Sequence, residues 1–293
     1  MDEATAFAPG HVTAFFAPYP DEDPARAGSR GAGVTLTDGV EATVRPAADA
    51  DGGTADAADP SAAGAVDLTL DGVAAAMEPV DRVLRELNVA AAVELRSDLP
   101  VGAGFGVSGA SALATALAAD AVFELGRSEN DLVRTAHAAE AAAGTGLGDV
   151  VAQFRGGLPV RLEPGAPGHG RLDGVPARPR VEYVTFGELS TERVLDGPLD
   201  PVREAGETAL ARLLERPTAT ELVSAGREFA DEAGLVVPEV AEAVAAAEVE
   251  AGVASMAMLG RTAFAFGTGL SAAGYDAASC GVHPTGATLR GGE

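Results

Sequence analysis

The chain has 293 residues, which is enough for one large domain or two modest ones with a sizeable core. Its 44 acidic residues outnumber 20 basic ones, all of them arginines, so the formal charge is −24. This balance argues against a nucleic-acid partner, because no basic stripe is available to neutralise phosphates. The single cysteine, Cys280, excludes an internal disulfide and a four-thiolate zinc site.

The acid excess is typical of a protein from a salt-accumulating halophile, in which salt screens self-repulsion. A GC-rich genome would explain the missing lysine but not the acid excess. The N-terminus lacks the basic flank and long apolar core of a signal peptide, and the longest apolar runs, such as residues 73–77, are too short to span a membrane. We therefore expect a cytoplasmic protein without a membrane partner.

Strands are predicted first along the chain. Residues 5–16 are rich in β-formers and are broken by Pro9-Gly10, and residues 33–45 read as two short strands around an Asp38-Gly39 hairpin turn. An acidic surface insertion is expected at 47–64, where nearly every residue is small, acidic or proline. A further strand follows at 66–70.

Helices alternate with strands further along. Apolar spacing predicts a helix at 73–87, and a short strand at 91–95 leads through a glycine-rich segment into a helix at 111–125. Ser128 resembles the cap of another helix at 132–143. The Pro- and Gly-rich stretch 163–180 indicates a domain boundary, so we expect one domain at 1–165 and a second at 166–293.

The second half is predicted to contain a strand at 181–186, helices at 202–214, 219–233 and 239–251, and a strand pair at 254–259 and 262–266. The end, 284–293, is expected to fray. Strands mixed with runs of helices favour an α+β fold over a regular series of strand–helix–strand units.

The richest chemical signal is the glycine-rich segment 100–111, which contains Gly102, Gly104, Gly106, Ser108 and Gly109. Glycines let a backbone approach a ligand closely, and the following helix offers unpaired N–H groups and the positive end of its dipole. This pattern predicts a phosphate cradle. Two known phosphate loops, the Walker A motif and the protein-kinase loop, need a lysine and are excluded. The G-x-G-x-x-G spacing leaves a dinucleotide-binding interpretation open.

Two carboxylates and two cations complete the candidate site. Glu140 lies late on a predicted helix, and Asp149 follows the turn 144–148. Phosphoryl transfer needs a carboxylate for Mg²⁺ and one for the substrate hydroxyl. His11, after a Pro-Gly turn, and Arg155 are the candidates to bind an anionic substrate, and Arg155 could form a bidentate pair with a carboxylate.

These segments in this order resemble the GHMP kinase superfamily. Pro9-Gly10-His11 is similar to its first motif, and the segment 100–112 is similar to its phosphate loop, while residues 254–260 occupy the place of the third motif without its run of glycines. Within the superfamily, the segments 8–16, 28–33, 104–109 and 144–153 are similar to the archaeal pantoate kinase branch.

The resemblance implies transfer of the γ-phosphoryl group of ATP to pantoate, giving 4-phosphopantoate for coenzyme A synthesis, with Mg²⁺ as the metal. It implies that Asp149 is catalytic and that Ser108 and Glu140 hold the metal ion. It also implies a two-domain GHMP fold, with an N-terminal domain like ribosomal protein S5 domain 2 and a ferredoxin-like C-terminal domain.

Several alternatives stay open at this point. Mevalonate or homoserine could replace pantoate as substrate, because all three carry a carboxylate. A nicotinamide-dependent oxidoreductase would use Gly104–Gly109 differently, and a silent nucleotide sensor would bind without turnover. The sequence leaves the oligomeric state open, with a homodimer as one candidate.

Overall fold

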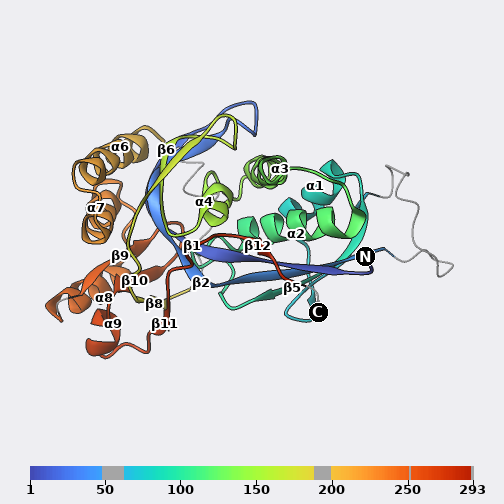
Figure 1. Cartoon of the computed structure of the whole chain (residues 1–293). Coiled ribbons are helices and arrows are strands. Elements are labelled where there is room, and N and C mark those ends of the chain that lie inside the picture. The colour runs from blue at the N-terminus through green and yellow to red at the C-terminus, as the bar shows by residue number, and fades with distance from the viewer. Residues whose placement is uncertain (48–62, 188–198, 251, 292–293) are drawn as a thin grey trace.

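The computed structural model of this chain describes residues 1–47, 63–187, 199–250 and 252–291. The insertion predicted at 47–64 lies almost wholly outside these residues. The described strands form two sheets, and helices pack on both (Figure 1). This mixed architecture confirms the α+β prediction. Within the same residues, no helix is long and apolar enough to cross a membrane.

The larger sheet has the strand order β12-β1-β2-β5-β3-β4, with β6 paired to β2 and β7 paired to β6. Its strands are β1 (Ala4–Tyr19), β2 (Gly28–Pro46), β3 (Gly64–Leu70), β4 (Val73–Ala74), β5 (Ala90–Ser97), β6 (Leu158–Glu163), β7 (Arg171–Val175) and β12 (Thr288–Leu289). All pairs are antiparallel except β3 with β5.

The hairpin predicted at Asp38-Gly39 is wrong, because β2 runs through it as one strand. The register of β1 with β2 moves from Pro9 opposite Gly39 to His11 opposite Thr35, so the extra residues of β2 form an irregular bulge instead of a turn. Pro9-Gly10 likewise does not end β1. The bulge places His11 at the point where the strand meets the glycine-rich loop, since the His11 N–H donates to the Phe105 carbonyl at 2.9 Å.

Four helices lie on one side of this sheet: α1 (Glu78–Glu86), α2 (Val107–Phe123), α3 (Glu129–Ala142) and α4 (Asp149–Arg155) (Figure 1). Helices α1, α2 and α4 contact its strands, and α3 packs on these three helices. Helix α2 is buried on nearly all sides and most of its side chains are small, as expected of a central helix. Ser128 caps α3 as predicted by accepting the Asp131 N–H. The helix predicted at 73–87 begins only at Glu78, because Val73–Ala74 pairs with β3 and a proline stands in the first helical turn.

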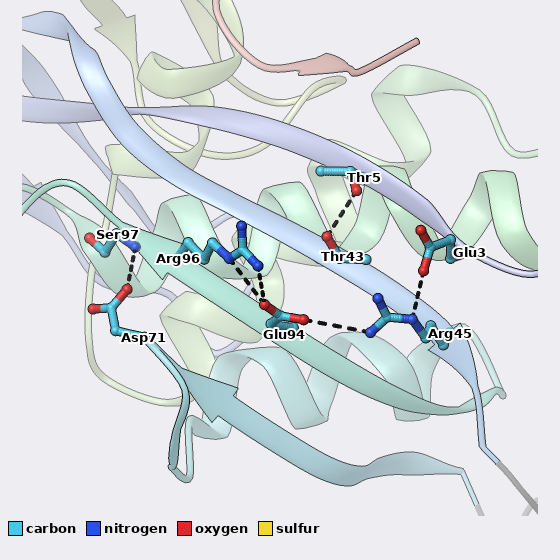
Figure 2. Close-up of polar contacts among 8 residues, drawn as sticks. All are labelled: Glu3, Thr5, Thr43, Arg45, Asp71, Glu94, Arg96 and Ser97. Atoms are coloured by element: carbon cyan, nitrogen blue, oxygen red, sulfur yellow. Dashed lines mark hydrogen bonds and ion pairs between the residues drawn. The ribbon is translucent and has the colours of Figure 1, made fainter. Parts of the chain in front are cut away.

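Polar side chains cover part of the opposite face of β1, β2 and β5 (Figure 2). Arg45 pairs with Glu3 and with Glu94, and Thr5 is bonded to Thr43 across the strands. This sheet therefore buries the face under the helices and presents a charged face to solvent.

The smaller sheet has the order β11-β8-β10-β9. It consists of β8 (Val181–Thr185), β9 (Val253–Ala257), β10 (Thr262–Phe266) and β11 (Ala278–Cys280), with helices α6 (Leu199–Glu215), α7 (Ala219–Glu232), α8 (Pro238–Val249) and α9 (Gly269–Ala272). Helices α6 and α7 also contact β1. The buried core is continuous between the two halves, and the domain boundary at residue 165 stays a prediction.

The frayed end predicted from residue 284 is wrong for the described residues. Strand β12 returns to the larger sheet, where Leu289 lies opposite Ala6 on β1. The His283 and Ala287 N–H groups bond the Thr35 and Gln153 carbonyls, so this segment closes over strand β2 and helix α4.

Candidate active site

The glycine-rich loop joins β5 to α2 and ends in the helix N-terminus. Gly106 is the residue before α2 and has φ 62°, in the left-handed region that favours glycine. No side chain caps this helix and its first turn carries no acid, so its free N–H groups suit an anion. A Cβ on Gly106 would lie 3.1 Å from the Asp149 side chain, which brings the cradle and the predicted catalytic residue together.

The turn between β9 and β10, together with the first residue of β10 in the smaller sheet, contacts this loop. Thr262 Oγ1 donates to the Ala103 carbonyl at 2.7 Å, and a Cβ on Gly260 would lie 2.7 Å from the Gly104 nitrogen. The Phe105 ring packs edge-on against Tyr183, with 4.8 Å between centroids. The segment in the place of the third motif therefore contacts the loop backbone.

Ser108 and Glu140 meet as predicted. Ser108 Oγ in the first turn of α2 donates to Glu140 Oε1 on α3 at 2.7 Å. Glu140 is 2% exposed, and burial raises its pKa to about 7, with the Asp149 charge adding to the effect and the Ser108 hydrogen bond opposing it. Its Oε2 is buried without a hydrogen-bond partner among the described residues.

An orphaned buried carboxylate oxygen beside a hydroxyl and a phosphate cradle fits a Mg²⁺ ion, which prefers oxygen ligands and takes most of them from phosphates and water. No group of three or more His, Cys, Asp or Glu side chains with metal-binding geometry occurs in the described part of the chain. The residues present thus fit a metal held jointly with a nucleotide.

Asp149 is the first residue of α4 and is hydrogen-bonded on its Oδ1. His11 Nδ1 lies 2.6 Å from that oxygen, and Thr13 Oγ1 donates to it at 3.4 Å. Burial acts to raise the pKa of Asp149, but the hydrogen bond from His11, the positive charge of Arg161 and the Thr13 bond together hold the pKa below its usual value. Asp149 is therefore ionised at neutral pH.

His11 is fully buried, and burial lowers its pKa against the pull of Asp149. Its Nε2 has no hydrogen-bond partner among the described residues, which fits a neutral ring that carries its proton on Nδ1. The histidine thus lies where it orients Asp149. Its predicted contact with substrate stays a prediction.

The two arginines after Asp149 lie in different places. Asp149 is the first and Arg155 the last of the seven residues of α4, so they lie about 9 Å apart along the helix axis. The Arg155 Nη1 donates to the Gly156 carbonyl at 3.0 Å. The structure does not bring it to the Ser108–Glu140–Asp149 cluster.

Arg161, on β6, lies beside Asp149 instead. It is 2% exposed, and burial lowers its pKa to about 10 against the opposing charge of Asp149. Its Nε and Nη1 have no hydrogen-bond partner in the described part of the chain. Burying a guanidinium whose N–H donors have no partner costs folding free energy unless an anion accepts hydrogen bonds from it.

A small cavity connects Arg161 with Asp149. Its polar wall includes Thr13 and Ser29, and its apolar wall consists of Phe16, Leu147 and Leu259. The cavity measures about 20 Å³, room for a single water, so its walls must separate to admit a substrate.

Sequence reasoning missed Arg161 and Gln153. Gln153 Nε2 donates to the Gly106 carbonyl at 2.8 Å and so fixes the turn into α2. Gln153 ends the segment 144–153 but was assigned no role, and Arg161 lies outside every motif. The available signal for Arg161 was a charged side chain inside the apolar strand 158–162.

Comparison with known proteins agrees with this geometry. Residues 73–157, which include the loop, Ser108, Glu140 and Asp149, match the family "GHMP kinases N terminal domain". The fold is similar to a homoserine kinase from Cytophaga hutchinsonii, with TM-score 0.70, 17% identity and coverage of 99% of this chain and 98% of the other. A further structure of this fold, at 15% identity and TM-score 0.69 with 98% of both chains covered, is a complex with MVAPP, AMPPCP and magnesium.

Sequence relatives are more specific. The chain is 37% identical to a pantoate kinase of Thermococcus kodakarensis, over 89% of this chain and 86% of the relative, and 30% identical to one of Methanospirillum hungatei, over 91% and 88%. A solved "Phosphotransferase related to CoA biosynthesis pathway" is 29% identical with TM-score 0.83 over 98% of both chains. The chain belongs to the GHMP kinases and, within them, to the pantoate kinase family.

Proposed function

We propose that this protein transfers the γ-phosphoryl group of ATP to the primary hydroxyl of pantoate, giving 4-phosphopantoate and ADP on the archaeal route to coenzyme A. The observation that carries the proposal is the cavity lined by both Asp149 and Arg161 beside the phosphate cradle. The relatives named pantoate kinase support the same reaction.

The chemistry of the cavity favours pantoate. Pantoate has a carboxylate at one end, a primary hydroxyl at the other and two methyl groups between them. Arg161 offers unused donors for the carboxylate, Asp149 an acceptor for the hydroxyl, and Phe16, Leu147 and Leu259 an apolar wall for the methyls. Homoserine would bring an ammonium group, and Asp149 is the only acid that lines the cavity among the described residues.

In the reaction, Asp149 accepts a hydrogen bond from the substrate hydroxyl and aligns its oxygen for in-line attack on the γ-phosphorus. The bond from that oxygen to phosphorus forms as the bond to the β-phosphate oxygen breaks, and Asp149 takes the hydroxyl proton. His11 keeps Asp149 oriented through Nδ1.

The N-terminus of α2 and its glycine-rich loop would hold the phosphates of ATP, and Ser108 with Glu140 would hold Mg²⁺. When bound there, the ion would offset the negative charge of the phosphates during transfer. A cytoplasmic location and a homodimeric state remain predictions.

The test is a coupled ADP-release assay with pantoate, mevalonate and homoserine in about 1 M KCl. The proposal requires pantoate to have the highest kcat/KM by at least about tenfold, the discrimination that a fitted pocket makes against a chain longer by one methylene or against an unpaired ammonium group. A preference for either other substrate would reassign the enzyme within the superfamily. Binding of ATP–Mg²⁺ without turnover of any of them would favour a nucleotide sensor.

A further inference from the structure

A second arginine-lined cavity lies at the opposite end of α4 from Asp149. It measures about 450 Å³ and carries Arg155 and Arg178 on an apolar wall formed by Val175, Pro176, Val282 and Pro284. No acidic residue lines it among the described residues. That composition is unusual for a chain in which acids outnumber bases by 44 to 20.

These two arginines also differ from most others in the chain. Nearly every described arginine forms an ion pair with a carboxylate. Within the described ranges, the arginines without such a pair are Arg127, Arg155, Arg161 and Arg178. Arg161 faces the candidate active site, Arg127 is exposed after α2, and the other two share this cavity.

The larger cavity between α1 and α3 shows the contrast. It is lined by Arg82, Arg85 and Arg134, but each of them is paired with an acid of its own helix at 2.6 to 2.9 Å. The positive charge there is already neutralised. The charge at Arg155 and Arg178 is not neutralised by a described neighbour.

The backbone holds Arg155 in position. Its Nη1 donates to the Gly156 carbonyl, and its guanidinium lies across Gly174 on β7, where a Cβ would overlap it. A guanidinium fixed in this way loses little side-chain entropy on binding and keeps its remaining donors for a carboxylate or a phosphate.

We infer that this cavity is an auxiliary anion site, which binds a small phosphate monoester or carboxylate with an apolar body. Its volume lies within the usual range for small-molecule sites, and its lining combines apolar surface with two arginines that have no described ion-pair partner. The site is separate from the catalytic cluster and does not depend on the proposed reaction. A backbone hydrogen bond links the two regions, because Gly157 lines the cavity and its carbonyl accepts the N–H of Thr35, which lies opposite His11.

The experiment is a ¹⁹F NMR titration of the full chain in high KCl with 4-fluorophenyl phosphate, 4-fluorobenzoate and the neutral 4-fluorobenzyl alcohol. Saturating ADP–Mg²⁺ and pantoate are present to occupy the catalytic site. Both anions, or one of them, should bind under these conditions, and the difference between them tells which headgroup the site prefers. The alcohol should bind at least about tenfold more weakly, since it lacks the charged hydrogen bonds.

Arg178→Gln should weaken anion binding about tenfold or more, and the double variant Arg155→Gln/Arg178→Gln should abolish it. Arg127→Gln is the matched control, because it removes an exposed arginine that also lacks a described ion pair, and it should bind like the wild type. Equal affinity for the neutral alcohol, unchanged binding in Arg178→Gln, or loss of all binding in the presence of ADP–Mg²⁺ and pantoate would overturn the inference.

Discussion

At the scale of single residues, Arg161 decides which substrates the site can hold. Replacing Arg161 with methionine removes the buried donors but keeps most of the side-chain volume, so the fold should survive. We predict that kcat/KM for pantoate falls about 10²-fold, mainly through KM, because charged hydrogen bonds to the carboxylate are lost. The KM for ATP should change little.

The measurement is initial-rate kinetics with pantoate and ATP varied in turn, with circular dichroism as the folding control. Arg161→Lys keeps the charge but not the planar fork of donors, so its KM should lie between those of the wild type and Arg161→Met. A folded Arg161→Met enzyme with an unchanged KM for pantoate would remove Arg161 from the substrate site.

Glu140 makes metal binding depend on pH. Burial raises its pKa to about 7, so at lower pH a proton occupies the carboxylate that would hold Mg²⁺. We predict that the apparent Mg²⁺ affinity rises as pH increases toward about 7 and levels off above it. The same shift makes the native state less stable as pH rises from about 4.5 to 7, because the folded chain retains a proton that the unfolded chain has lost.

Mg²⁺ titrations of ADP release between pH 5.5 and 8.5 check this prediction. The Glu140→Gln variant, which cannot ionise, should bind Mg²⁺ weakly at every pH. A wild-type affinity that does not vary over this range would contradict the assigned role.

The resemblance to known kinases indicated which residues far apart in the sequence lie together. Ser108 and Glu140 were expected together, and their side chains are hydrogen-bonded. The role of Arg161 could not be predicted, because it depends on the pairing of β6 with β2, which places Arg161 beside Gly148. Local sequence patterns do not determine which distant strands pair or in which register.

At the scale of elements, the turn between β9 and β10 supports the phosphate loop. A methyl group at Gly260 would overlap the Ala103 carbonyl and press on the Gly104 nitrogen, and both are backbone atoms that cannot swing aside. We predict that Gly260→Ala shifts the loop and lowers kcat/KM for ATP about 10²-fold, as displacements of about 1 Å can do.

Gly291→Ala is the control, since nothing lies within 4 Å of a Cβ at that glycine. Steady-state kinetics with ATP as the varied substrate give the readout. Normal ATP kinetics in a folded Gly260→Ala enzyme would show that the loop does not depend on this turn.

Helix positions were predicted best where apolar residues recur with a strong helical period. Helices α6, α7 and α8 lie close to the expected ranges. The Asp38-Gly39 turn signal failed because distant segments of the same chain supply the backbone hydrogen bonds there. The Thr37 N–H donates to the Gly281 carbonyl, and the Asp98 N–H donates to the Gly39 carbonyl. Such tertiary contacts replace a hairpin with a bulge, and local turn chemistry does not reveal them.

At the scale of the whole molecule, charge governs the conditions under which the chain folds. A net charge of −24 opposes compaction unless salt screens it, and the screening length falls to about 3 Å at 1 M. We predict that melting temperature and activity both rise with KCl up to the order of 1 M. The surface ion pairs of the arginines contribute little in that medium.

Thermal melts and ADP-release rates from 0.05 to 3 M KCl test this directly, with NaCl as a second salt. Full activity and an unchanged melting temperature in dilute buffer would show that the acid excess has no such role. The sequence predicts this behaviour without reference to the fold, because it depends on composition alone.

The central claim is that Asp149 aligns the pantoate hydroxyl for phosphoryl transfer. The most direct measurement is kcat of Asp149→Asn with pantoate at saturating ATP–Mg²⁺ in high KCl. Asparagine is nearly isosteric and still accepts the bond from His11, so the fold and ATP binding should persist. A general base contributes typically about 10²–10⁴-fold, and we predict a loss of kcat in that range. A folded variant that keeps more than about half of the wild-type kcat would contradict the mechanism.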